Sequence, residues 1–404
     1  MSLEIFNTFE FINTDEWCRM AVDAKDLFDN QKTFIHLFPS TSTQLKSPEN
    51  FLNSEILDNK FLNLPSNGGF RLQELCETSH RISGSLLSNL SQVIVKDSSL
   101  LVLVKNSLAL TEGYGDRRWL EYQVNSWPQM HNSYPCLIAV DSKQPIQTRV
   151  KGYKLNVNIQ TVPIPAIYLS VRSIDKNIYH WIFEVLPRLK CLDIVPELNE
   201  IPLIIREPLN QYQIDTLKLM GVSNKLIITN GESFLAQQLF FPSIPSPPTL
   251  HAECVFWLRN KILGNMPKTK NKKRRIYISR RDSTRQVANE EDLMRELNNH
   301  GFEFLCMSDL QATEQINAFR EAEVIVLPHG AAGAHILFAP QDCSIIELHS
   351  PEWINNVYCC LANILGQDYR HLIGTKVDGA GNYSINKSNL IQALDIVYLH
   401  KKHH

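Results

Sequence analysis

The chain has 404 residues, of which 44% are hydrophobic and 20% charged, a composition that excludes a wholly disordered protein. Forty Lys and Arg against 42 Asp and Glu give a net charge of −2, which excludes a protein built to coat nucleic acid or an acidic membrane over its whole surface. At the usual domain size of about 150 residues, this length predicts two or three domains.

The cysteines and the N-terminal residues predict where the protein resides. Nine cysteines are present, an odd number, and no C-x-x-C pair occurs among them. This usage indicates neither a disulfide framework nor a zinc ribbon, and it favours a reducing compartment. The first residues lack the basic and then apolar order of a secretory signal, and no apolar run approaches about 18 residues. We therefore expect a cytoplasmic protein, and a peripheral contact at the inner face of the membrane stays open.

The N-terminal part of the chain predicts a mixed α/β region. Residues 91–97 (SQVIVKD) and 100–107 (LLVLVKNS) carry alternating aliphatic residues around a short break, which predicts a β-hairpin. Strands and helices then alternate, at 166–171, 178–192, 201–207, 211–221 and 225–229. The proline-rich run 241–250 predicts a linker between domains, because proline removes hydrogen-bond donors and stiffens the chain.

The alternation is clearer in the second half of the chain. A helix at 252–263 and a charged run at 268–275 come first. Strands are then predicted at 275–280, 302–307, 323–328 and 343–349, and helices at 289–301, 312–322 and 330–339. This order is typical of a doubly wound parallel sheet.

Together these elements predict an α/β protein with two Rossmann-like domains that face a central cleft. The N-terminal domain spans 1–248, with 1–150 the less regular part, and the C-terminal domain spans 249–385. The remaining residues, 386–404, predict a helix that packs back on the N-terminal domain.

A turn of small residues, HGAAGAH at 329–335, follows the strand 323–328. Such a turn exposes the N–H groups of the next helix, which suits a phosphate. Close packing of helix on sheet explains the alanines equally well, and both interpretations stay open. The two histidines need polar partners in this apolar setting. The next strand ends with Glu347, a carboxylate that can accept both hydrogen bonds of a ribose diol.

Nine basic residues and a single acid, Asp282, lie between positions 268 and 285. The part at 268–275 is typical of a solvated linker. Arg280 and Arg281 instead follow a strand, where guanidinium groups can bind a diphosphate. Nucleic acid is the alternative partner, and the presence of only one aromatic residue in the run, Tyr277, argues against it.

The predicted helix at 178–192 has a polar stripe. At about 100° per residue, His180, Glu184 and Arg188 fall on one side and the aliphatic residues on the other. An imidazole one turn from a carboxylate suits a general base and its orienting partner. A surface ion pair between Glu184 and Arg188 beside an exposed histidine is the alternative that periodicity leaves open.

Five segments taken together resemble glycosyltransferase family 61: 177–189, 274–293, 301–304, 314–338 and 345–351. The resemblance extends over 163–374, about half the chain. It implies a GT-B fold, an inverting mechanism and a nucleotide-sugar donor, usually a UDP-sugar. It also implies that the C-terminal domain holds the donor, while the acceptor and the base come from the N-terminal domain.

The resemblance assigns roles to individual residues. The donor site would consist of Ser279, Arg280, Arg281, His329, Gly330, Ala331, Ala332, Gly333 and Glu347. His180 would be the base, oriented by Glu184, with Asp282 as the rival base and Arg188 on the acceptor side. No cofactor is required and a divalent metal is optional. The family turn often continues with Leu and then Thr or Asn, so the role of His335 stays open.

We therefore expect an inverting glycosyltransferase that moves a sugar to a hydroxyl of a glycan or glycoconjugate, in surface polysaccharide biosynthesis. A nucleotide-sugar epimerase of GT-B fold and a non-catalytic scaffold that binds nucleotides or glycans remain the alternatives. We expect no nucleic-acid partner, and the oligomeric state is left open.

Overall fold

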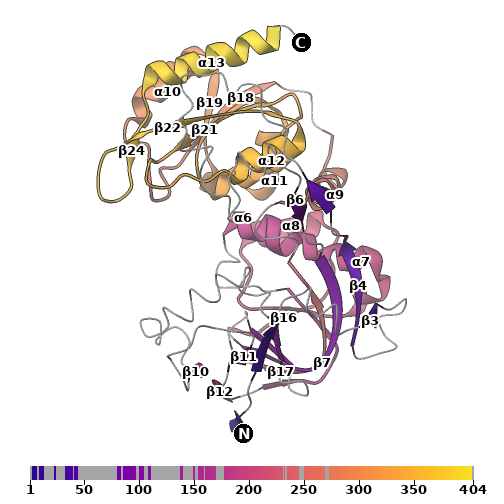
Figure 1. Cartoon of the computed structure of the whole chain (residues 1–404). Helices are drawn as coiled ribbons and strands as arrows, with labels where there is room; N and C mark the ends of the chain where they lie inside the picture. The colour runs from indigo at the N-terminus through magenta and orange to yellow at the C-terminus, as the bar shows by residue number, and fades with distance from the viewer. Residues whose placement is uncertain are drawn as a thin grey trace. The chain divides into compact units, whose positions relative to one another are not determined.

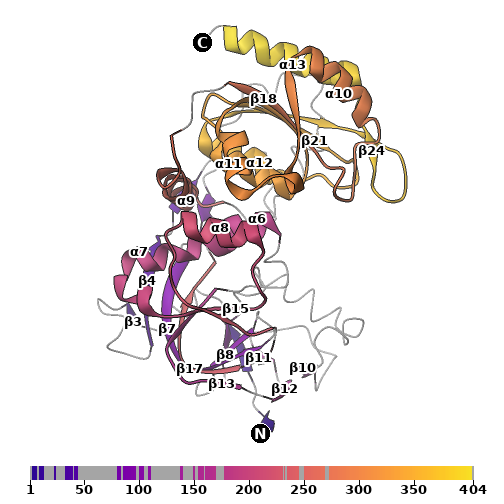
Figure 2. The same ribbon diagram turned by 180° about the vertical axis from the view of Figure 1, so that it is seen from behind.

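The computed structural model describes residues 160–169 and 177–402, except 231, 233, 245–249 and 269–272, together with strand segments between residues 2 and 158. The chain divides into two compact units (Figures 1 and 2). The first comprises Met1–Thr41, Ser83–Asn210 and Gly221–Pro248, and the second comprises Ser42–Ile82, Gln211–Met220 and Thr249–His404. The main division thus falls after Pro248, but the helix near residue 215, which we predicted in the N-terminal domain, groups with the second unit.

The first unit is built on a mixed sheet of twelve strands. Its larger parallel part consists of β13 (Gln160–Val162), β14 (Ala166–Tyr168), β15 (Leu203–Ile205), β16 (Leu226–Ile228) and β17 (Phe234–Pro242). The long strand β7 (Ser85–Lys96) pairs antiparallel with both β17 and β8 (Leu100–Leu103), so the predicted hairpin is confirmed. Val93 and Val95, two positions apart on β7, are both buried because alternate residues of a strand face the same side.

The other N-terminal strands are short. They are β1 (Ser2–Phe6), β2 (Phe9–Ile12), β3 (Val22–Asp23), β4 (Lys32–Phe38), β5 (Thr41–Thr43), β6 (His80–Ile82), β9 (Leu108–Leu110), β10 (Leu137–Ala139), β11 (Arg149–Val150) and β12 (Tyr153–Asn158). The sequence did not predict β17, whose last residues begin the run that we predicted as a linker. Residues 245–249 of that run lie outside the described residues.

The single helix predicted at 178–192 is a series of short helical segments. They are α6 (Ile178–His180), the π-helix η3 (Trp181–Val185), the 3₁₀-helix η4 (Leu186–Leu189), α7 (Lys190–Ile194) and η5 (Pro196–Glu200). Pro187 causes the break, because it has no N–H and its ring obstructs the carbonyl four residues earlier. The preceding turn widens in response, and the N–H of Leu186 bonds to the carbonyl of Trp181, five residues back.

Arg188 does not lie on the polar stripe that we predicted for it with His180 and Glu184. Its side chain is fully buried, and its guanidinium donates to the carbonyls of Tyr168 at 2.7 Å, Pro242 at 2.5 Å and Leu169. It also lies over the ring of Phe241. The wide π turn moves the residues beyond it away from their α-helical directions, so Arg188 faces inward. The acceptor-side role that we predicted for it is wrong, because the side chain exposes no surface and its donors are directed to the backbone.

Replacing Arg188 with methionine is expected to lower the free energy of unfolding by about 2 kcal/mol or more. Three buried carbonyls lose their donor, and a buried unsatisfied polar group costs about 1–3 kcal/mol. Urea denaturation measures the change. The matched control is Arg295→Met, because Arg295 is 78% exposed on a helix surface. Equal urea midpoints for the two variants would contradict a structural role for Arg188.

The second unit has a five-stranded, fully parallel sheet in the order β19-β18-β20-β21-β22. The strands are β18 (Arg274–Ser279), β19 (Phe302–Cys306), β20 (Ala322–Pro328), β21 (Ser344–His349) and β22 (Asp368–Ile373). Numbered along the chain, their order is 2-1-3-4-5, a doubly wound arrangement. The predicted parallel sheet of the second half is therefore confirmed, with β22 added at its edge.

Helices cover both faces of this sheet. The helices of the second unit are α8 (Gln211–Leu219), α9 (Ala252–Gly264), α10 (Glu290–Asn299), α11 (Ala312–Arg320), α12 (Val357–Leu365) and α13 (Lys387–Lys402), with the 3₁₀-helices η6 (Met307–Asp309) and η7 (Ala331–Phe338). In both views α10 and α13 lie on one face, and α11 and α12 lie on the other (Figures 1 and 2). A hairpin of β23 (Thr375–Lys376) and β24 (Tyr383–Ser384) precedes α13.

The packing of α13 differs from our prediction that it returns to the N-terminal domain. Its apolar residues Leu390, Leu394 and Val397 are fully buried in the core of the second unit, with side chains of the sheet and of α10. Among the described residues, no helix has both the length and the hydrophobicity that crossing a bilayer requires. The six described cysteines are free and buried.

Candidate functional site

The two sequence motifs of the second half meet at the point where the strand order of the sheet reverses. Ser279 ends β18, His329 and Gly330 follow β20, and these two strands are neighbours although the chain visits β19 between them. In open α/β sheets, ligands bind outside the carboxyl ends of the strands at this switch point. The fold therefore places Arg280 and the turn after β20 where a ligand is expected.

Arg280 packs directly on Gly330. A Cβ atom added to this glycine would lie 1.6 Å from Nη1 of Arg280, so only glycine leaves room for the guanidinium. The Nε of Arg280 donates to the carbonyl of Thr284 at 2.7 Å. Within the part of the chain that the structure describes, its two terminal nitrogens have no hydrogen-bond or ion-pair partner. The structure thus brings Arg280 into contact with the glycine turn, and both were assigned to the donor site by the sequence.

Arg285 belongs to the same site, although no sequence pattern distinguishes it from the other residues of the basic run. Its φ of 58° is rare for a residue other than glycine, and such strain is kept mainly at functional sites. Its guanidinium lies 4.9 Å from the ring centre of Trp353, in the loop after β21. Its Cγ lies 3.1 Å from where a Cβ on Gly381 would be. The loops that carry Trp353 and Gly381 thus both flank this side chain.

The two arginines concentrate positive charge in this region. Burial lowers the pKa of both guanidinium groups, and the charge of Arg280 lowers the pKa of Arg285 further. Neither forms an ion pair with a carboxylate among the described residues. Half-buried cations that repel each other favour binding of an anion.

The other predicted residues of this loop face elsewhere. Arg281 is 65% exposed and pairs with Asp309 at 3.1 Å, and Asp282 is also exposed. Ser279 is buried and donates to Glu290 at 2.9 Å, which fixes the start of the loop.

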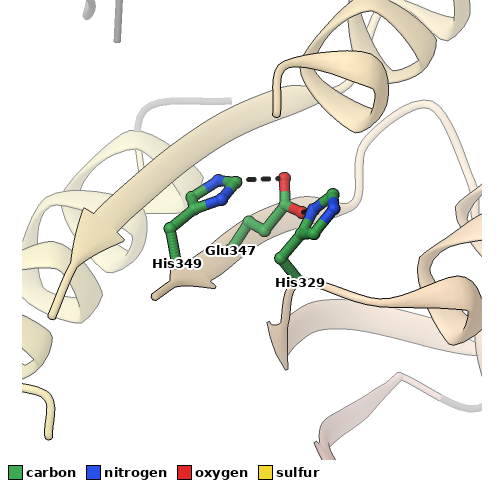
Figure 3. A group of neighbouring side chains, drawn as sticks. All are labelled: His329, Glu347 and His349. Atoms are coloured by element: carbon green, nitrogen blue, oxygen red, sulfur yellow. Dashed lines mark hydrogen bonds and ion pairs between the residues drawn. The ribbon is translucent and has the colours of Figure 1, made fainter. Parts of the chain in front are cut away.

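The structure contradicts the predicted contact of Glu347 with a ribose diol. The side chain is fully buried at the end of β21, and both oxygens have protein partners (Figure 3). Oε1 lies 2.6 Å from Nδ1 of His329, and Oε2 accepts a hydrogen bond from Tyr369 at 2.5 Å. His349 lies 3.5 Å from the same Oε2. A ligand therefore cannot reach this carboxylate. Glu347 instead contacts His329 and Tyr369.

Protonation in this group follows from burial and hydrogen bonding. Burial disfavours the charged form of Glu347, but His349 and His329 outweigh it and hold the pKa of the carboxyl well below its usual range. Burial also lowers the pKa of His329, against the pull of Glu347. An ionised Glu347 that accepts from the Nδ1–H of a neutral His329 satisfies both groups.

His329, Glu347 and His349 also have ligand atoms within 4.8 Å of one another, a grouping that can bind a divalent cation. The 2.6 Å contact is a hydrogen-bond distance, and Oε2 already accepts from Tyr369. Hydrogen bonds therefore already join His329, Glu347 and Tyr369 without a metal.

The rest of the turn after β20 packs against the protein. A Cβ on Gly333 would lie 2.4 Å from the ring of Tyr358, whose hydroxyl donates to the Gly330 carbonyl at 2.7 Å. His335 is fully buried, and its Nδ1 donates to Ala332 while Nε2 accepts from Tyr212, each at 3.0 Å. Burial lowers the pKa of His335 to about 4. Both histidines of the turn thus have the polar partners that we expected, and His335 is structural.

The first unit contains the predicted pair of His180 and Glu184. Nδ1 of His180 lies 2.8 Å from Oε1 of Glu184, and the two side chains are 25% and 13% exposed. The side chain of Asn177 accepts from the N–H of Tyr179 and caps the start of α6. The structure therefore brings imidazole and carboxylate together on a helical segment that remains open to solvent.

A doubly wound parallel sheet defines an α/β fold, and two arginines without a carboxylate partner among the described residues at its switch point are an arrangement that suits an anionic ligand. Comparison with known proteins makes the class more specific. Residues 178–346 match the family model of Glycosyltransferase 61. The chain thus carries a glycosyltransferase family 61 domain over these residues.

One relative supports this assignment. A stretch of 97 residues is 34% identical to the EGF domain-specific O-linked N-acetylglucosamine transferase of Drosophila melanogaster. The aligned stretch covers 23% of this chain and 18% of that protein. It is a distant homologue, and most of each chain lies outside the alignment.

Proposed function

We propose that the protein transfers a sugar, with inversion, from a nucleotide-sugar to a hydroxyl of a glycan or glycoconjugate. The observation that carries this proposal is the pair of half-buried arginines without a carboxylate partner, at the switch point of a glycosyltransferase family 61 domain. A nucleoside diphosphate supplies the missing negative charge. Because the distant homologue is named for N-acetylglucosamine transfer, UDP-N-acetylglucosamine is the first donor to test.

The diphosphate is assigned to Arg280 and Arg285, beside the backbone of Gly330 and the first residues of η7. Guanidinium groups make strong hydrogen bonds to phosphate oxygens, and the start of a helix adds unpaired N–H groups. Two guanidiniums neutralise the departing diphosphate, so the proposal requires no divalent cation.

The chemical step needs a base and a stabilised leaving group. His180, oriented by Glu184, takes the proton from the acceptor hydroxyl. The acceptor oxygen forms the new bond to C1 of the sugar, while the bond from C1 to the diphosphate oxygen breaks and its electron pair leaves with the diphosphate. The arginines stabilise the charge that develops there. Asp282, which is exposed, is the rival base.

Binding of UDP tests the donor site directly. UDP is expected to raise the Tm of the wild-type protein, because a ligand that binds only the folded state stabilises it. Gly330→Ala should weaken UDP binding by about tenfold, because the new methyl group displaces Arg280 and one charged hydrogen bond contributes about 1.5–3 kcal/mol. A Tm shift measured against UDP concentration gives the affinity.

Gly379→Ala is the matched control for this experiment. Gly379 is exposed, and a Cβ there would meet no atom within 4 Å. The affinity of the Gly379→Ala variant for UDP should equal that of the wild-type protein. A wild-type protein whose Tm does not respond to UDP or UDP-N-acetylglucosamine would refute the proposed donor site.

A further inference from the structure

The hydrogen bond between His329 and Glu347 fixes which nitrogen of the imidazole carries the proton. An ionised carboxylate can only accept, so Nδ1, 2.6 Å away, is the protonated nitrogen of the neutral ring. Nε2 then has a lone pair and no proton. Figure 3 shows that this nitrogen lies on the side of the ring away from the carboxylate. Among the described residues, Nε2 has no hydrogen-bond partner.

The ring is held rigidly in this orientation. His349 stacks on it with ring centres 5.2 Å apart and planes 23° apart, and the ring of Tyr358 lies at 5.5 Å on a tilted plane. The backbone N–H of His329 donates to the carbonyl of Leu348 at 2.8 Å, which fixes the chain at the end of β20. The side chain keeps 9% of its surface exposed, so a ligand can touch it only at an edge.

Burial keeps the imidazole neutral. It is the main cause that lowers the pKa of His329, and the neighbouring His349 and Arg285 act in the same direction. Glu347 opposes them through its charge and its hydrogen bond. A neutral ring with a lone pair at Nε2 accepts a hydrogen bond and cannot donate one to a phosphate oxygen. We therefore assign the phosphates to the arginines, and we assign a different group of the ligand to His329.

We propose that Nε2 of His329 accepts a hydrogen bond from a hydroxyl of the donor that adjoins its diphosphate, and that Glu347 is the positioning residue behind it. The inference rests on the proposed function, because the diphosphate at Arg280 brings the ligand beside the adjacent turn. A ribose and a transferred sugar both offer a hydroxyl at this distance from the phosphates. In either case the site selects for a hydroxyl, since an analogue that lacks it leaves a buried acceptor unpaired.

The test compares ligands that differ by one hydroxyl. For the ribose, we would measure the affinities of UDP, 2′-deoxy-UDP and 3′-deoxy-UDP by isothermal titration calorimetry. For the sugar, we would compare UDP-glucose with UDP-2-deoxyglucose. The wild-type protein should bind one deoxy analogue about tenfold or more weakly than its parent, because an unpaired buried polar group costs about 1–3 kcal/mol. The pair that shows the difference identifies the source of the hydroxyl.

Two variants should abolish this discrimination. His329→Phe retains an aromatic ring of similar size without the acceptor nitrogen. In Glu347→Gln, the amide oxygen accepts the hydrogen bond of Tyr369 and the amide N–H faces Nδ1, which moves the imidazole proton to Nε2 and turns the acceptor into a donor. Glu347→Gln keeps the volume of the buried side chain and so remains informative if His329→Phe does not fold. Tyr369→Phe removes the other bond to Glu347 but leaves the one to His329, so it should keep the wild-type discrimination.

Failure of this inference is distinguishable from failure of the proposed function. If the wild-type protein binds UDP but treats every deoxy analogue like its parent, the role of His329 is refuted while the donor site stands. If His329→Phe and Glu347→Gln both discriminate between the deoxy analogue and its parent as the wild-type protein does, the role of His329 is also refuted. If the wild-type protein does not bind UDP, the proposed function itself fails.

Discussion

Replacing His180 with alanine is expected to lower kcat by about 10²–10⁴-fold under saturating UDP-sugar and acceptor, the range typical for loss of a general base. The 2.8 Å contact with Glu184 orients the imidazole, so Glu184→Gln should lower kcat as well, by a smaller factor. Release of UDP, measured with and without acceptor, reports the rate. KM for the donor should change little in either variant, because the pair is assigned to the acceptor hydroxyl.

A second helical histidine provides a matched control. His300 and Glu296 form a similar pair four residues apart, 3.8 Å between Nε2 and Oε1, at the end of α10. His300→Ala should leave kcat within about twofold of wild type, because surface substitutions away from a site change little. If His180→Ala keeps a rate near wild type while Asp282→Asn loses it, Asp282 is the base and our assignment is wrong.

Arg280→Met and Arg285→Met should each weaken UDP binding by about 10–10²-fold. A hydrogen bond to a charged group contributes about 1.5–3 kcal/mol, and each variant removes one cation from the diphosphate site. Titration of UDP by calorimetry measures the loss, and Arg295→Met, on the exposed surface of α10, controls for the loss of a positive charge elsewhere. The wild-type affinity should also fall as salt rises, because ions screen the charges.

The same variants have an expected effect without nucleotide. Arg280 and Arg285 are half-buried, repel each other and form no ion pair with a carboxylate among the described residues. Their removal should therefore leave the Tm of the ligand-free protein unchanged or raise it, as is common when a binding site is relieved of its unfavourable charges. A lower Tm in the free protein, with unchanged UDP affinity, would show that the arginines support the fold instead of binding the donor.

The strands and helices of the second half could be predicted because their signal is local. Parallel strands such as β20 and β21 are short apolar runs between helices, and the positive φ of Gly221 and Gly301 fits the helix ends that the sequence marked. Missed elements lack such a signal. Seven of the nine residues of α12 are buried, so it has no polar face, and β22 (DYRHLI) mixes charged and apolar residues.

By itself, the sequence determined the order along the chain of the strands and helices from β18 to β21, and the two segments that meet at the switch point of this sheet. The alternation of strands and helices along the chain suffices for this, because a parallel sheet places the carboxyl ends of its strands at one edge. The tertiary structure alone decided which side chains face that edge. Glu347 points inward to His329, Arg188 is turned to backbone carbonyls by the π-helix, and Arg285 joins Arg280. Each outcome depends on partners distant in sequence, which a local pattern cannot contain.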